Sequence, residues 1–185
     1  MPADLAEARR FWRAVFGDDR PVEVEIGPGR GEVILAFAAA RPTTNFFGIE
    51  RGREAAEAIT GAAARRGLAN VRVVAADARC VARFLPAASV AAYHIYFPDP
   101  WPKTRHRARR LVGDDFARDL ARTLEPGGLL HVASDLPPVL ADLTRHLVRA
   151  ALIPVAEAAA PRPTTAFERK YAGAGTCYGC FARAG

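Results

Sequence analysis

The chain has 185 residues and a mass of 19.9 kDa; half of its residues are apolar, a quarter are charged and 9% are aromatic. This length and apolar content exclude intrinsic disorder and favour a single domain over residues 1–185 with one hydrophobic core. The 26 Lys and Arg residues outnumber the 20 Asp and Glu residues and give a formal net charge of +6, which favours polyanionic partners such as nucleic acid.

The sequence shows no pattern typical of membrane insertion or export. No apolar run approaches the roughly 20 residues of a membrane-spanning helix. Residues 1–16 mix acids and arginines and have no apolar stretch of the kind found in signal peptides. The three cysteines, an odd number in a chain this long, do not suggest a disulfide framework. We therefore expect a soluble, cytoplasmic protein with no membrane partner.

The predicted elements alternate between helices and strands along the chain. An N-terminal helical segment occupies residues 1–20, with apolar residues at helical spacing over 3–16. The predicted strands are 22–26, 45–50, 71–75, 90–97, 129–133 and 176–183. The further predicted helices are 32–40, 53–66, 114–125 and 138–151. Apolar strands that alternate with helices of this length indicate an α/β fold, with a mostly parallel sheet covered by helices on both faces.

Acidic residues lie at the ends of the predicted strands. Parallel sheets bind their ligands beyond the carboxyl ends of the strands. An acid lies at or just after the end of each of the first five strands, and these acids are Glu25, Glu50, Asp77, Asp99 and Asp135. A hydrophobic core has no use for such residues, so the sequence predicts a ligand site at this edge of the sheet.

A glycine-rich loop follows the first strand and opens the next helix. Gly27, Gly29 and Gly31 allow the backbone to approach a ligand closely. The loop is not a dinucleotide fingerprint, because the third glycine of that motif is replaced by Glu32. Glu25, just before the loop, would repel a pyrophosphate, so the loop favours a cationic ligand.

The next two strand ends add the features expected of a nucleoside site. Glu50 can accept hydrogen bonds from both hydroxyls of a ribose, and Asp77 with Ala78 can bind an adenine amino group. A ligand with a ribose, an adenine, a cationic amine and no phosphate is S-adenosylmethionine. The ordered set, followed by a Leu-Glu-Pro-Gly-Gly turn before the fifth strand, resembles the Rossmann-like class I methyltransferase domain.

The segment FPDPWPKTRHRARR, residues 97–110, adds a second group of features. Two prolines fix the backbone around Asp99, Trp101 offers a stacking surface, and residues 101–110 hold five Lys or Arg. This segment resembles a motif of the bacterial tRNA (guanine-N7-)-methyltransferases. The resemblance continues in the family's order through four further segments, which read VEVEIGPGRGE, FFGIE, HVASD and PRPTTAFE.

The resemblance implies S-adenosylmethionine-dependent methyl transfer to N7 of guanine in tRNA, at guanine 46 of the variable loop. It implies that Asp99 is the catalytic residue and also binds the cofactor, together with Glu25, Glu50 and Asp77. It also implies an antiparallel C-terminal strand and a substrate loop at 158–170. The implied substrate-binding residues are Lys103, Asp135, Thr165, Phe167 and Glu168.

Two departures from the family pattern bear on tRNA binding. The family has a longer basic segment before the cofactor loop, and Ala166 stands where the family has Lys or Arg. Two alternative functions therefore stay open: another RNA or base N-methyltransferase, and a non-catalytic RNA-binding protein that keeps the fold. The sequence leaves the oligomeric state open between monomer and homodimer.

The remaining cysteine and histidine residues predict no metal site. Cys177 and Cys180 form a single C-x-x-C pair, whereas zinc sites need a second pair or added histidines. In a strand over 176–183 these two side chains would point to opposite faces. His131, within an apolar strand, is interpreted as a buried core histidine rather than a catalyst.

Overall fold

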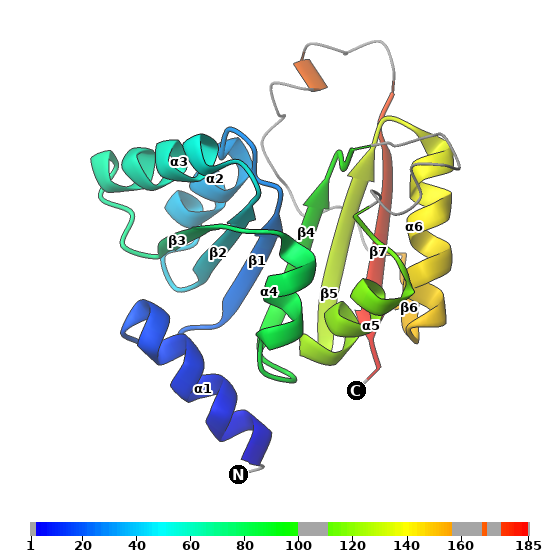
Figure 1. Ribbon diagram of the computed structural model, residues 1–185, viewed down its shortest axis with the longest axis horizontal. Coiled ribbons are helices and arrows are strands. Elements are labelled where there is room, and N and C mark those ends of the chain that lie inside the picture. The colour runs from blue at the N-terminus through cyan, green and yellow to red at the C-terminus, as the bar shows by residue number, and fades with distance from the viewer. Residues whose placement is uncertain (1–2, 100–110, 157–167, 170–174, 185) are drawn as a thin grey trace.

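A computed structural model of the protein describes residues 3–99, 111–156, 168–169 and 175–184 (Figure 1). A seven-stranded sheet has the strand order β3-β2-β1-β4-β5-β7-β6. The strands are β1 (Val22–Ile26), β2 (Asn45–Glu50), β3 (Val71–Ala75), β4 (Val90–Tyr96), β5 (Leu124–Ser134), β6 (Leu152–Pro154) and β7 (Cys177–Arg183). Strand β7 runs antiparallel to both β5 and β6, and the other paired strands are parallel. The predicted sheet with an antiparallel C-terminal strand is thereby confirmed.

Helices cover both faces of the sheet, as predicted. They are α1 (Ala3–Phe16), α2 (Glu32–Ala40), α3 (Arg53–Arg65), α4 (Ala78–Phe84), α5 (Asp114–Thr123) and α6 (Pro137–Arg149). Buried side chains of α2 and α3 form one apolar cluster with strand residues, and those of α1, α4, α5 and α6 contribute to a second cluster. In the described part of the chain, no helix is both long enough and apolar enough to cross a bilayer.

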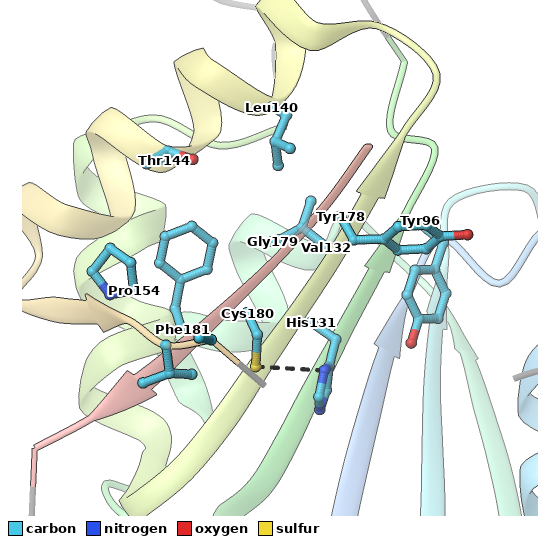
Figure 2. Close-up of a pocket in the computed structure, with 12 residues that line it drawn as sticks. Tyr96, His131, Val132, Leu140, Thr144, Pro154, Tyr178, Gly179, Cys180 and Phe181 are labelled. Carbon is cyan, nitrogen blue, oxygen red and sulfur yellow. Dashed lines mark hydrogen bonds between the residues drawn. The ribbon is translucent and has the colours of Figure 1, made fainter. Parts of the chain in front are cut away.

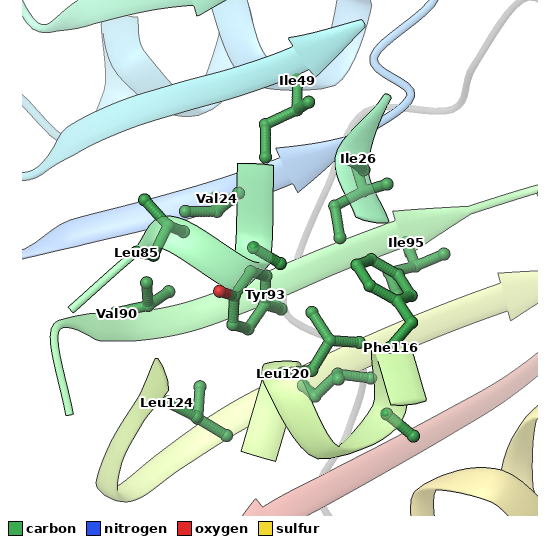
Figure 3. Packing of buried hydrophobic residues seen from close by; sticks show 14 of the residues in the cluster. Val24, Ile26, Ile49, Leu85, Val90, Tyr93, Ile95, Phe116, Leu120 and Leu124 are labelled. Atoms are coloured by element: carbon green, nitrogen blue, oxygen red, sulfur yellow. The ribbon is translucent and has the colours of Figure 1, made fainter. Parts of the chain in front are cut away.

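The larger apolar cluster is built around β4 (Figure 3). Tyr93 is fully buried there, and its hydroxyl group lies 2.7 Å from the hydroxyl of Thr123, so its polar atom is satisfied inside the core. Val24 of β1 and Leu120 of α5, also fully buried, contribute to the same cluster. This packing fixes β4 and β1, the two strands at the middle of the ligand-binding edge.

Helix α1 packs on the sheet through Trp12. The indole N–H donates a 2.6 Å hydrogen bond to the carbonyl oxygen of Ser89, and the ring lies 5.3 Å from that of Phe47 in an edge-to-face contact. In this structure Trp12 and Phe16 are buried in the larger cluster.

The boundary between α5 and β5 differs from the prediction. Residues 114–125 were expected to be helical up to the Pro-Gly-Gly turn, whereas α5 ends at Thr123 and β5 already begins at Leu124. Leu124 pairs with Val90, and the register then shifts before the rest of the strand pairs with β4. The turn is therefore a bulge within one long strand, because pairing with β4 outweighs the local signal of a strand break.

Two short elements escaped the sequence analysis. Helix α4 has only seven residues, too few for a periodic apolar pattern, and its N-cap is Asp77, whose carboxylate accepts a 2.9 Å hydrogen bond from the backbone N–H of Arg79. At its other end the Arg122 guanidinium donates to the carbonyl oxygens of Ala82 and Arg83. Strand β6 has three residues and follows α6 directly.

Two glycines of the glycine loop differ in how closely they pack against neighbouring side chains. Gly31 has φ +75°, and a Cβ atom added to it would lie 2.8 Å from Cγ1 of Ile59 on α3. Gly27 has a similar φ of +70°, but a Cβ atom there would meet nothing within 4 Å. A substitution would therefore cause similar backbone strain at both glycines, but only at Gly31 would the new side chain clash with a neighbour.

We predict that Gly31→Ala destabilises the fold more than Gly27→Ala. Both variants should lose about 1–2 kcal/mol from left-handed backbone strain, and overpacking against Ile59 should add about 1–3 kcal/mol to the first. Urea denaturation of both variants and the parent chain measures the difference. Equal losses would contradict the close contact between this loop and α3.

Candidate active site

The glycine loop crosses the carboxyl ends of β1 and β2. Its three glycines, Gly27, Gly29 and Gly31, all have positive φ angles, of 70°, 56° and 75°. The backbone N–H of Gly27 donates a 2.9 Å hydrogen bond to the carbonyl oxygen of Ile49, which ties the start of the loop to β2. Left-handed conformations at three alternate positions explain why glycine is needed at each of them.

Glu50 holds this loop from the end of β2. Its Oε2 atom accepts a 2.9 Å hydrogen bond from the backbone N–H of Gly29, and its Oε1 atom accepts a 2.8 Å bond from that of Gly52. A carboxylate oxygen can accept more than one hydrogen bond. Glu50 therefore fixes two loops and keeps acceptor capacity for a ligand.

Asp77 lies across from Glu50 at the end of β3. Its carboxylate is paired with the Arg79 guanidinium, with distances of 3.0 Å from Nε to Oδ1 and 2.6 Å between the closest atoms. The hydrogen bonds from the Arg79 side chain lower the pKa of Asp77, although partial burial opposes this, and the charge of Arg51 adds a smaller effect. Asp77 is therefore an anion near neutral pH, and Arg79 competes with any ligand for its oxygens.

These residues border one cavity of about 250 Å³ at the carboxyl edge of the sheet. Five of the residues predicted to bind cofactor line it: Gly27, Glu50, Asp77, Ala78 and Asp99. The other three, Glu25, Gly29 and Gly31, are not among its lining residues. Glu25 is buried within β1, where it stands opposite His94 in the strand register.

The chain matches a family model described as "Putative methyltransferase" over residues 19–176. It is 42% identical to the tRNA (guanine-N(7)-)-methyltransferase of Leifsonia xyli over 168 residues, which cover 85% of this chain and 73% of that protein. The chain belongs to the tRNA (guanine-N(7)-)-methyltransferase family. The protein of the same name from Hydrogenovibrio crunogenus is 41% identical over 125 residues, or 67% of this chain. This match spans about half (52%) of the length of the Hydrogenovibrio protein.

Solved structures agree with this family at the level of the fold. The aminoglycoside resistance methyltransferase NpmB1 superposes with a TM-score of 0.68 and 22% identity, covering 95% of this chain and 93% of that one. The 16S rRNA methyltransferase KamB gives the same TM-score at 18% identity, covering 94% and 93% of the two chains. The structure of this family member is thus a class I methyltransferase fold, as the sequence predicted.

The predicted substrate-binding residues are only partly placed. Lys103, Thr165 and Phe167 lie outside the described residues. Asp135 is half-buried, directly follows β5 and is not among the residues that line the cavity. Glu168 accepts a 3.3 Å hydrogen bond from the Tyr178 hydroxyl. The next residue, Arg169, forms an ion pair with Glu32 of α2.

That ion pair links Arg169, near the end of the predicted substrate loop, to the start of α2. The Arg169 guanidinium lies 2.5 Å from Oε1 of Glu32, the first residue of the helix that follows the glycine loop. Arg169, near the end of a segment predicted to bind substrate, therefore lies beside the end of the loop predicted to bind the cofactor.

The cavity also contains residues that sequence reasoning missed, namely Arg51, Arg79, Tyr96, Phe97 and Leu111. Arg79 could have been found, since it follows the predicted Asp77 by only two residues. Phe97 has a strained backbone, with φ of +50°, and no sequence pattern predicts this conformation. Leu111, which precedes α5, also lines the cavity, and nothing in its local sequence indicates this.

Tyr96 also lines a second cavity, of about 400 Å³, which borders β5 and β7 (Figure 2). His131 is buried here, with its Nδ1 atom 3.7 Å from Sγ of Cys180. Its ring stacks on that of His94 at 5.3 Å between centroids, and Nε2 of His94 lies 2.8 Å from Oε2 of Glu23. The described residues include no group of three or more side chains suited to hold a metal ion.

The burial of His131 makes stability depend on pH. Burial, with a smaller effect from the neighbouring His94, lowers the pKa of His131 to about 4; Glu23 acts to raise it and Arg41 to lower it. Because an unfolded histidine has a pKa of about 6.5, the unfolded chain binds more protons between these values. Stability therefore falls as pH drops from 6.5 towards 4.

We predict that His131→Gln flattens this dependence. The buried imidazole should cost the parent chain up to about 3 kcal/mol of unfolding free energy between pH 7 and 4, and the neutral glutamine should remove that loss. Urea unfolding at pH 7, 5.5 and 4.5 measures it for both proteins. The same pH dependence in the parent and the variant would contradict a neutral, buried His131.

Proposed function

We propose that this chain transfers a methyl group from S-adenosylmethionine to N7 of guanine in tRNA, at guanine 46 of the variable loop. The observation that carries the proposal is the convergence of Glu50, Asp77 and Asp99 on one cavity, in a chain of this family. We treat residues 1–185 as one catalytic domain, with residues 158–170 as its substrate loop.

The cavity suits the chemistry of S-adenosylmethionine. Glu50 has acceptor capacity for the ribose hydroxyls, and Asp77 with Ala78 can bind the adenine amino group. Gly27 lines the cavity, and the absence of a side chain there leaves space for a ligand. Glu25, buried in β1 just before the loop, would favour a cationic amine over a phosphate. When bound, S-adenosylmethionine supplies an electrophilic methyl group.

Guanine N7 already carries a lone pair, so methylation removes no proton and needs no general base. The protein must instead align N7 with the methyl group and the sulfur atom, which is a proximity effect. On transfer, N7 would take the methyl group and the purine would gain the positive charge that the sulfonium loses. The Asp99 carboxylate can stabilise this charge or orient the base through its N–H groups.

The tRNA would be held by the residues that the sequence predicts to bind substrate. Lys103 and the arginines after it are suited to neutralise phosphates, and the net charge of +6 favours the same polyanion. Asp135 would contact substrate from the end of β5. The loop residues Thr165, Phe167 and Glu168 would do so from the C-terminal segment, which Arg169 ties to α2.

We predict that the purified chain, given S-adenosylmethionine and unmodified tRNA, forms 7-methylguanosine, and that tRNA with adenine at position 46 gives none. Nucleoside mass spectrometry identifies the product. A different methylated nucleoside would indicate another RNA methyltransferase. Measurable cofactor binding without any product would favour an RNA-binding protein that has lost turnover.

Asp99→Asn in the same assay separates chemistry from binding. Loss of the carboxylate should lower turnover about 100- to 1,000-fold, with affinity for S-adenosylhomocysteine changed far less. Asp115→Asn, at an exposed position on α5, is the matched control and should behave like the parent chain. Full activity of the Asp99 variant would exclude an essential charge at this position.

A further inference from the structure

A third cavity adjoins the cavity that is predicted to bind the cofactor. It measures about 410 Å³ and shares Pro98, Asp99 and Leu111 with that cavity. Its other walls come from Val112, just before α5, and from the segment between the end of β5 and the middle of α6. Its volume is within the range of about 300–1,000 Å³ that is typical of pockets for small ligands.

The walls of this cavity suit a flat ring with one polar edge. Pro98 and Leu111 contribute apolar surface from the chain after β4, and Pro138 and Val139 contribute it from the first turns of α6. Apart from Asp99, its charged lining residues are Asp142 and Arg145 of α6. A largely apolar cleft with few polar groups is typical of sites that bind aromatic ligands and fix their orientation.

Asp142 is held in place for such a role. Its side chain is 17% exposed, and the Arg145 guanidinium lies 2.5 Å from its Oδ1 atom. The ion pair favours one orientation of the carboxylate at the cavity wall, while Arg145 itself is 65% exposed. The cavity therefore has an oriented hydrogen-bond acceptor on α6 and a second carboxylate, Asp99, at its junction with the cofactor cavity.

We infer that this cavity receives the acceptor guanine and that Asp142 recognises its Watson–Crick edge. The inference rests on the proposed function. The N1–H and N2–H groups of guanine are adjacent donors that one carboxylate can accept together, whereas adenine presents an unprotonated N1 at the same edge. Enzymes that modify bases commonly take the base out of its stack and read this edge in an apolar pocket.

The same pose directs N7 to the reaction. N7 lies on the far side of the purine from N1 and the N2 amino group. With that edge against Asp142 on α6, N7 points away from the helix, towards Asp99 and the cofactor cavity. The shared wall of Pro98, Asp99 and Leu111 is then where acceptor and methyl donor meet. Asp142 is thus a specificity residue, separate from the catalytic Asp99.

Inosine, which is guanosine without the N2 amino group, provides the test. The assay measures methylation of transcripts with guanosine or inosine at position 46 by the parent chain and by the Asp142→Ala variant. For the parent, inosine should lower kcat/KM at least about tenfold, because the carboxylate loses one donor. In Asp142→Ala, kcat/KM on guanosine should fall to a similar level, and inosine should cause little further loss.

Calorimetric titration with S-adenosylhomocysteine controls for folding, because Asp142→Ala should bind it as the parent does. Val139→Trp, which fills the cavity, should retain this binding and lose methylation, and Asp115→Asn should change neither. An undiminished inosine penalty in Asp142→Ala would overturn the inference and leave the proposed function standing. Absence of product from the parent with guanosine transcripts would overturn both.

Discussion

The two backbone hydrogen bonds accepted by Glu50 hold the site together. One comes from Gly29 in the loop after β1 and the other from Gly52 in the loop after β2. A single carboxylate therefore sets the distance between two strand ends and the shape of the loop between them. Hydrogen bonds to a charged acceptor are stronger than those between neutral groups, so a small number of them can fix this geometry.

The strand order brings the other charged groups to the same place. Because β1, β2, β3 and β4 are parallel, their carboxyl ends meet at one edge, and Asp77 and Asp99 are placed with Glu50 although they are far apart in the chain. Asp77 is held by Arg79, and Asp99 forms part of the wall between two cavities. Asp99 thereby separates the cavity suited to the nucleoside of the cofactor from the cavity suited to the acceptor base.

The main strands and most of the cavity acids could be predicted from the sequence, because strand periodicity and strand order place them without knowledge of side-chain packing. The bulge after Leu124 could not, since only pairing with Val90 extends β5 across a Pro-Gly-Gly turn. The seven-residue α4 lacked a periodic pattern. Asp142 and Arg145 read in sequence as an ordinary ion pair three residues apart on a helix, and only tertiary structure places them at a cavity next to Asp99.

A crystal structure with S-adenosylhomocysteine would test most directly whether this edge of the sheet binds the cofactor. We predict that the ribose hydroxyls lie within hydrogen-bond distance of Glu50 and that the adenine amino group lies beside Asp77, with the sulfur facing Asp99. A ligand bound elsewhere, such as in the cavity beside His131, or one that makes no contact with Glu50, would contradict this assignment.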